Sequence, residues 1–345
     1  MTGVDGHFPL TTKEGWAAFV ARGPSAVQLV PDRDWRRQSP ADREEYDRSR
    51  FEHHARLIVV ATPTVRQVTH TGRRLVLLNR GQISARRGII ITGAAGTGKT
   101  TAVTQLGLSH ELRARRRRTG GEPFLPVVYV TVPPAATAKM LAAEFARFAG
   151  LPIPSAFNQA SITNAVCDVL GKLGTELVIV DELQNLNLAT RAGAETSDQL
   201  KYLSERIPAT FVYAGLDVED NGLFTGPRGK QIAGRFAAIE AAPFGYATAG
   251  QRQDWHALLA TLDEAIRLHR HKPGALLEHA AYLHQRTAGM IGSLSHLVRE
   301  TAVDAILDGT EKITKAGLER VTLDRAAETA AARHREAVRP RRKVS

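Results

Sequence analysis

Short apolar runs alternate with longer segments of helical periodicity through the middle of the chain. Continuous β-branched runs of this length are typical of strands that are buried on both faces of a sheet. The candidate strands are GIIIT (88–92), PVVYVTV (126–132), LVIVD (177–181), ATFVYAG (209–215) and AAIEAAPF (237–244). Between them, apolar positions at helical spacing predict helices near 100–116, 137–149, 160–172 and 197–206. The alternation predicts an α/β fold with a five-stranded parallel sheet and helices on both faces.

The N-terminal residues 1–80 show a different pattern and predict an extension of helical segments. The breaks RGPSA, VPDRD and QSPAD separate these segments. The clearest helix is expected over 40–60, capped by Ser39, with acidic residues early and arginines later as the helix dipole favours. His53 and His54 have no partner at metal-ligand spacing, so we interpret them as surface or packing residues.

After GYATAGQ the chain becomes helical again. QDWHALLATLDEAIRLH, ALLEHAAYLHQRT and MIGSLSHLVRETAVDAILDG each carry apolar residues at helical spacing, which predicts a small all-α domain. The last dozen residues are basic and contain Pro340. We therefore expect four sections: an N-terminal extension (1–80), the α/β core (81–245), a helical lid (246–330) and a basic disordered tail (331–345).

The segment GIIITGAAGTGKTT has the spacing G-x-x-x-x-G-K-T directly after a predicted strand. Glycines let backbone N–H groups close around phosphate oxygens, and the following helix adds the positive end of its dipole. Lys99 is expected to reach the β and γ phosphates, and the Thr100 hydroxyl to bind Mg²⁺. The predicted nucleotide-binding residues are Gly93, Ala94, Ala95, Gly96, Thr97, Gly98, Lys99, Thr100 and Thr101. The cofactors are accordingly ATP and Mg²⁺.

A second acidic motif follows about eighty residues later, where ELVIVDELQNL places two acids at the end of an apolar strand. Asp181 is expected to hold Mg²⁺ through water, and Glu182 to orient and deprotonate the attacking water. This pair distinguishes ATPases with an in-line glutamate from GTPases and small-molecule kinases. Gln184 and Asn185 suit either of two roles, sensing the γ phosphate or capping the next helix.

Phosphoryl transfer also requires positive charge on the leaving oxygens, often from an arginine of a neighbouring subunit. Arg235, in QIAGRFAAIE at the start of the fifth strand, is the candidate. Arg228 and Lys230 are alternatives in the glycine-rich loop FTGPRGKQ. A surface arginine without a catalytic role is the competing interpretation.

The charge balance suggests a polyanionic partner. Lys and Arg number 46 against 35 acids, a net charge of +11, and the excess is concentrated in RARRRR (113–118) and RHREAVRPRRK (333–343). Solvated basic loops are the alternative, and no base-stacking platform stands out among the aromatic residues. The single cysteine, Cys167, excludes disulfides and a cysteine metal cluster within the chain and fits a reducing cytoplasm. With no secretory leader pattern and no apolar stretch near the roughly 20 residues of a membrane span, we expect neither export nor membrane insertion.

The order GAAGTGKT, VIVDE, TFVYAG, GRF and a helical lid resembles an AAA+ ATPase. More narrowly, HHARLIVVATPTVR, VTVPPAATAKMLAAEFARFAGLP, VDELQNL and AGRFAAIEAAPFG resemble the TniB-type ATPases of DNA transposition, relatives of TnsC and MuB. The resemblance covers about residues 40–325. It implies an ATPase that assembles on double-stranded target DNA as a ring or filament and recruits or stimulates a transposase, with hydrolysis driving disassembly. The resemblance also implies catalysis between subunits, in which Arg235 would act as an arginine finger on the nucleotide of a neighbouring subunit.

Two positions depart from the family's pattern. The fourth strand, which normally ends in a polar sensor, presents Ala214, Gly215 and Leu216, with Asp217 or Thr210 as imperfect substitutes. The lid's usual sensor arginine is also missing, and Arg299 lies about two turns further along. We therefore expect hydrolysis that is slow or stimulated by a partner.

Two other functions fit the same core. One is a nucleotide-dependent switch or scaffold that binds protein partners. The other is a helicase-loader-like or defence-associated ATPase. Genomic neighbourhood separates the last from a transposition regulator, because only the regulator is expected beside a transposase gene.

Overall fold

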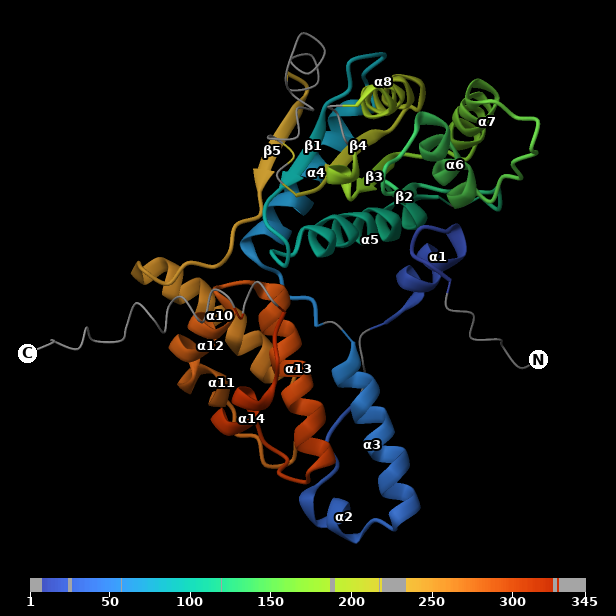
Figure 1. The fold of residues 1–345 in the computed structure, drawn as a ribbon. Helices are drawn as coiled ribbons and strands as arrows, with labels where there is room; N and C mark the ends of the chain where they lie inside the picture. The colour runs from blue at the N-terminus through green and yellow to red at the C-terminus, as the bar shows by residue number, and fades with distance from the viewer. Residues whose placement is uncertain are drawn as a thin grey trace, which may run out of the picture. The chain divides into compact units, whose positions relative to one another are not determined.

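The chain forms two compact units, each built from segments distant in sequence (Figure 1). The computed structural model describes residues 8–23, 27–56, 58–118, 120–186, 190–216, 218, 234–324 and 328. The sheet unit comprises the described residues of Met1–Gly23 and Pro63–Ala241, and the helical unit those of Pro24–Thr62 and Ala242–Ser345. These units divide the chain differently from the four sections expected from the sequence. In particular, residues 63–80 group with the sheet and 27–56 with the C-terminal helices.

The sheet has five parallel strands in the order β2-β3-β4-β1-β5. They are β1 (Gly88–Thr92), β2 (Val127–Thr131), β3 (Leu177–Asp181), β4 (Thr210–Ala214) and β5 (Phe236–Glu240). This confirms the predicted α/β class, and β1 and β3 have the expected bounds. The fifth strand was expected over 237–244 but ends at Glu240, shortly before Pro243, which lacks the N–H needed to continue a ladder.

Helices cover both faces of the sheet. One face carries α1 (Lys13–Ala21), α4 (Pro63–Asn79) and α5 (Lys99–Arg117), and the other carries α6 (Ala138–Ala149), α7 (Gln159–Lys172) and α8 (Arg191–Arg206). The helix expected over 197–206 thus begins earlier, at Arg191, because the Thr190 side chain accepts a hydrogen bond from the Gly193 N–H and caps the N-terminus.

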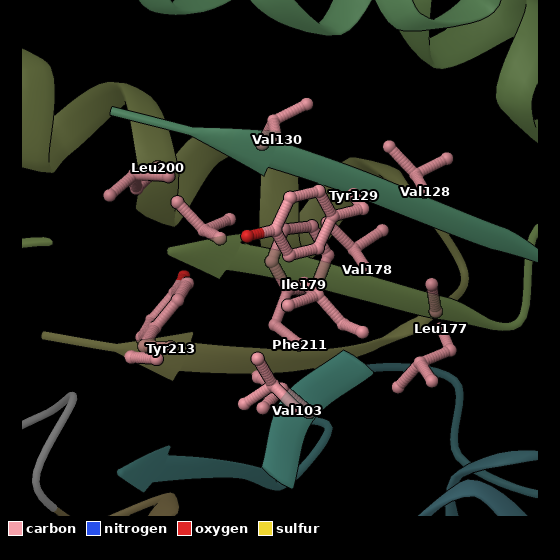
Figure 2. Packing of buried hydrophobic residues seen from close by; sticks show 14 of the residues in the cluster. Val103, Val128, Tyr129, Val130, Leu177, Val178, Ile179, Leu200, Phe211 and Tyr213 are labelled. Carbon is pink, nitrogen blue, oxygen red and sulfur yellow. The ribbon is translucent and has the colours of Figure 1, made fainter. Parts of the chain in front are cut away.

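The core of the sheet unit lies on the central strands, where β1, β3 and β4 are almost completely buried. Figure 2 shows part of this core, with apolar side chains of β2, β3 and β4 packed together and Val103 of α5 against one side. Tyr129 and Tyr213 bring two hydroxyl groups into this apolar region. A buried hydroxyl needs a hydrogen-bond partner, and the partner of Tyr129 belongs to the site described below.

The helical unit contains seven helices among its described residues. They are α2 (Asp32–Arg37), α3 (Pro40–Ala55), α10 (Ala249–Glu264), α11 (Ala275–Glu278), α12 (Ala280–Thr287), α13 (Ile291–Leu307) and α14 (Lys315–Arg320). Ser39 caps α3 as predicted, but α3 ends at Ala55 instead of residue 60, because Arg56 takes an extended conformation. The helix expected over 275–287 is divided at His279, whose ψ of 13° leaves the helical region.

An ion pair joins α3 to the C-terminal part of the helical unit. Arg50 donates from two nitrogens to the carboxylate of Glu311, at 2.7 and 2.9 Å, and both side chains are almost completely buried. The Asp47 carboxylate also binds Arg50. The helix predicted near residue 50 is therefore an integral part of this unit.

Candidate nucleotide site

The loop between β1 and α5 is shaped by glycines in conformations that other residues avoid. Gly93, Gly96 and Gly98 have φ of 142°, 77° and 90°. A Cβ at Gly93 would lie 2.3 Å from the carbonyl oxygen of Ala241, closer than any real contact. Glycine is therefore required at this position, and the backbone takes the strand–loop–helix path expected of a P-loop.

Lys99 is the first residue of α5, and its ammonium group is folded onto the loop. Its Nζ donates to the carbonyl oxygens of Gly93 and Ala94, at 2.7 Å each, and the side chain is 9% exposed. The Thr97 hydroxyl also donates to the Ala94 oxygen, at 2.9 Å. The loop thus holds a positive charge at the N-terminus of a 19-residue helix, where an anion is favoured.

Asp181, at the end of β3, joins the P-loop helix to the sheet. Its Oδ2 accepts from the Thr100 hydroxyl at 2.8 Å and from the Tyr129 hydroxyl at 3.0 Å. Its Oδ1 accepts from the Glu182 backbone N–H at 2.8 Å, and the residue is 2% exposed. The structure therefore brings together Thr100 and Asp181, the two residues predicted to bind Mg²⁺. They follow or end the strands β1 and β3, which β4 separates in the sheet.

Tyr129 is a site residue that the sequence did not single out. It lies in an apolar run that indicates the core of a strand. The only sequence signal was its hydroxyl group, which requires a hydrogen-bond partner when it is buried. Burial, with Asp181 beside it, raises the pKa of Tyr129 above its ordinary value. The phenol therefore stays protonated and donates a hydrogen bond to the carboxylate.

Glu182 follows at a turn with strained backbone geometry. Its φ of 60° lies in the left-handed region, which a glutamate rarely adopts. Its carboxylate is exposed and accepts a hydrogen bond from Gln184 Nε2, whose own Oε1 accepts from the Leu216 N–H at 3.0 Å. Gln184 thus connects Glu182 to the segment after β4.

Gln184 and Asn185 both have partners in neighbouring segments. Gln184 bridges Glu182 and Leu216, and its two expected roles, sensing the γ phosphate or capping the next helix, stay predictions. Asn185 donates from Nδ2 to the Val132 carbonyl oxygen at 2.8 Å, after β2. Both therefore fix the loop after β3 to neighbouring strands.

Arg235 lies at the opposite edge of the sheet from the P-loop. It precedes the pair Gly88–Phe236, at the start of the parallel strands β1 and β5, whereas the P-loop follows their far ends. A five-residue strand spans roughly 16 Å. Arg235 forms an ion pair with Glu205 of α8 and does not reach the P-loop of its own chain. The alternatives Arg228 and Lys230 lie outside the described residues.

The structure also places the substitutes considered for the sensor positions. Thr210 lies at the start of β4, where its hydroxyl accepts from Asn79 Nδ2 at 2.8 Å, so it is at the wrong edge of the sheet for a phosphate sensor. Arg299, in the helical unit, donates from Nε to the His54 carbonyl oxygen at 2.9 Å. Asp217 lies outside the described residues.

The basic run 113–118 forms the C-terminal end of α5, and local carboxylates pair with part of it. Arg115 binds Glu111 at 2.6 Å and Arg117 binds Glu176 at 3.0 Å. Arg118 binds Glu122 at 3.1 Å. These contacts reduce the charge that the run offers to a polyanion. The second basic run, 333–343, lies outside the described residues.

The described residues contain no group of three or more acidic, histidine or cysteine side chains placed to hold a metal ion by themselves. Within the same residues, no helix has both the length and the apolar character required to cross a bilayer.

The sheet order, the P-loop and the acidic strand end define the AAA+ P-loop fold. Similar folds are found in the Aeropyrum pernix ORC1 protein in complex with DNA (TM-score 0.58, 19% identity, covering 83% of this chain and 70% of that chain). The Aeropyrum pernix ORC2 protein with ADPNP and ADP has a TM-score of 0.58 (18% identity, 76% and 67% covered). Cdc6p from Pyrobaculum aerophilum has a TM-score of 0.51 (16% identity, 76% and 67% covered).

The family model described as the bacterial TniB protein matches residues 59–246, more than half of the chain. The chain therefore belongs to the TniB family. A search of curated proteins gave no match.

Proposed function

We propose that this protein is an ATP-dependent regulator of DNA transposition. It binds ATP, assembles with further copies of itself on double-stranded DNA, and recruits or activates a transposase, with hydrolysis driving disassembly. The observation that carries the proposal is the hydrogen bond from Thr100 to Asp181, which joins a P-loop helix to an acidic strand end in a TniB chain.

The P-loop residues suit a nucleoside triphosphate. The loop 93–101 is built from glycines that leave room for phosphate oxygens, and Lys99 already lies across it on two carbonyl groups that phosphates would replace as its partners. The Thr100 hydroxyl would supply one oxygen ligand for Mg²⁺, and Asp181 would hold the ion through water. A bound Mg²⁺ would neutralise charge on the phosphate oxygens.

Glu182 is the proposed base that orients and deprotonates water. Its carboxylate is exposed beside Asp181, and Gln184 holds it in position. Arg235 is the proposed finger and acts on a nucleotide held by another copy, because it lies at the edge of the sheet away from its own P-loop. Hydrolysis therefore depends on assembly, which agrees with the expected slow basal rate.

The proposed binding of DNA and a transposase is supported by the family match, the charge of the chain and a similar solved structure, and not by the geometry of the nucleotide site. The TniB match, the net charge of +11 and a solved ORC1 protein of similar fold that is in complex with DNA all favour a DNA-bound role. Contacts to the phosphate backbone would make binding tolerant of sequence and strongly dependent on salt.

The test is nucleotide-dependent DNA binding by the purified chain. Fluorescence anisotropy and negative-stain imaging are carried out with ATP, a slowly hydrolysed analogue, ADP or no nucleotide. Assembly is expected only with the triphosphates, and Lys99→Ala is expected to abolish it. Lys139→Ala, the same substitution at an exposed lysine of α6, serves as the matched control.

DNA binding that is absent or indifferent to nucleotide would contradict the proposal. The nucleotide-dependent switch that binds proteins would then be favoured. Assembly that requires ATP but fails to recruit a transposase would favour the helicase-loader-like or defence-associated ATPase.

A further inference from the structure

A second cluster of cations lies at the amino edge of the sheet. A hollow of about 250 Å³ is bordered by α4, by the residues that lead into β1 and by the start of β5. Its polar side chains are Thr71 and Arg74 of α4, Arg87 before β1 and Arg235 before β5. We refer to the cavity that these four side chains border as the arginine hollow.

Hydrogen bonds of a buried amide fix the position of Arg87 in this hollow. Asn79, 6% exposed, donates from Nδ2 to the Arg87 carbonyl oxygen at 2.7 Å and accepts from the Arg87 N–H at 3.0 Å. The same Nδ2 donates to Thr210 of β4. The Gly88 N–H donates to the Arg235 carbonyl oxygen at 3.1 Å, which places Arg87 and Arg235 side by side at the start of paired strands. The backbone around the hollow is therefore rigid.

The arginine hollow carries more positive than negative charge. Arg235 pairs with Glu205, whereas Arg74 and Arg87 form no ion pair with any residue that the structure describes. Like charges gathered in one hollow repel one another, and an anion between them relieves this repulsion. The planar fork of guanidinium donors matches the oxygens of a phosphate group.

We propose that the arginine hollow is a phosphate-binding site separate from the P-loop. Its volume is below the roughly 300–1,000 Å³ of pockets that enclose whole drug-sized ligands, so it takes a phosphate group and not a complete nucleotide. The P-loop lies at the other end of β1, so the phosphate comes from another molecule.

Two molecules in the proposed function present such a phosphate, and to this extent the inference rests on that function. One is the nucleotide in the P-loop of a second copy, in a head-to-tail assembly in which one edge meets the opposite edge of the next copy. Arg74 and Arg87 would then act beside Arg235. The other is the backbone of DNA. The chemistry at the arginine hollow is the same for both.

The experiment compares Arg74→Ala and Arg87→Ala with Arg86→Ala. Arg86 is the neighbour of Arg87 and does not border the hollow, so its replacement removes the same charge. Arg87→Lys keeps the charge and removes the fork. Circular dichroism and thermal melting first establish that all four variants are folded.

Three readouts follow. The first is ATP hydrolysis on DNA, alone and after mixing with Glu182→Gln subunits, which bind ATP, assemble and supply intact arginines but do not hydrolyse ATP. The second is the salt dependence of DNA affinity with a slowly hydrolysed ATP analogue. The third is the rise in melting temperature caused by inorganic phosphate at constant ionic strength in the Lys99→Ala background, which requires neither hydrolysis nor DNA.

A site for the neighbour's nucleotide predicts at least tenfold slower hydrolysis in Arg74→Ala and Arg87→Ala, restored by mixing with Glu182→Gln subunits. A site for DNA predicts a salt slope shallower by about 1 for each arginine removed. Either site predicts loss of the phosphate-induced stabilisation, only partly recovered in Arg87→Lys. The proposal is overturned when both alanine variants match Arg86→Ala in all three readouts. Phosphate stabilisation that depends on Arg74 and Arg87, in a chain that fails to bind DNA with ATP, would contradict the proposed function and leave the phosphate site in place.

Discussion

Tyr129 donates its hydroxyl hydrogen to Oδ2 of Asp181 across 3.0 Å, from the neighbouring strand of the sheet. The same oxygen accepts the Thr100 hydroxyl, so two donors fix one carboxylate that is almost completely buried. Residues that hold a metal ligand in place affect the site nearly as strongly as the ligand itself. Tyr129 is thus a positioning residue for the proposed Mg²⁺ site.

We expect Tyr129→Phe to reduce Mg²⁺-dependent ATP hydrolysis by roughly 10- to 100-fold, the usual effect of losing an outer-shell hydrogen bond to a metal ligand. Hydrolysis is measured over a range of Mg²⁺ concentrations. Tyr213→Phe is the control, because it removes a buried phenol oxygen from the same sheet; Tyr129 pairs with Ile179 and Tyr213 with Val180, so the two rings point to opposite faces. Equal rates in the two variants would remove the role given to Tyr129.

Glu182→Gln is expected to trap the ATP-bound assembly on DNA. The amide preserves the size and hydrogen-bonding capacity of the side chain but cannot accept a proton from water. Dissociation from labelled DNA is followed after dilution into excess unlabelled DNA, and the lifetime should rise at least tenfold over that of the wild type. Dissociation at the wild-type rate would contradict the assignment of Glu182 as the base.

Glu311→Ala should destabilise the helical unit by about 3–5 kcal/mol, because it leaves the Arg50 charge buried without its main partner. Urea unfolding, followed by tryptophan fluorescence, measures the loss. Adding Arg50→Met should recover part of it, since the unpaired cation is then absent. Glu319→Ala breaks an exposed pair with Lys315 and should cost less than about 1 kcal/mol. A similar cost for both glutamates would refute the prediction.

Acid should weaken the helical unit through His54. Burial, with His53 beside it, lowers the pKa of His54 from 6.5 to about 4. The unfolded chain therefore binds a proton that the folded chain excludes, and stability falls as pH drops from 6.5 to 4, by roughly 3 kcal/mol over the full range. His54 Nε2 accepts from the Arg267 N–H, so His54→Gln keeps an acceptor and removes the titration.

The comparison of urea midpoints at pH 7.5, 6.0 and 5.0 tests this expectation. His54→Gln should flatten the pH dependence between these values. An unchanged slope would assign the acid sensitivity to other groups.

The sequence predicted the parts of the fold that local patterns determine. The apolar runs 88–92 and 177–181 gave two strands with their bounds, and the glycines of 93–98 gave the loop between β1 and α5. The P-loop and the acid pair follow from spacing alone, and the structure brings Thr100 and Asp181 together as the motifs implied. These features were predictable because each depends on a pattern of a few consecutive residues.

Contacts between distant segments were not predictable in this way. Arg50 and Glu311 are 261 positions apart, and neither has a local pattern that indicates its partner. The helix α4 was placed in an N-terminal extension, although Val68, Leu75 and Val76 bury one of its faces in the sheet unit. Its apolar spacing predicts a helix with one buried face, but only the three-dimensional structure shows what covers that face.

Trp16 of α1 stacks on the ring of Tyr129, with centroids 6.0 Å apart, and donates from Nε1 to Glu111 at 3.3 Å. The other two tryptophans of the sequence, Trp35 and Trp255, both belong to the helical unit. A chain with phenylalanine at these two positions would therefore emit from a single indole, one aromatic ring away from the hydroxyl that holds Asp181. We expect the emission of this indole to change when a nucleotide binds beside Asp181, so that occupancy of the site could be followed in real time without attaching a dye.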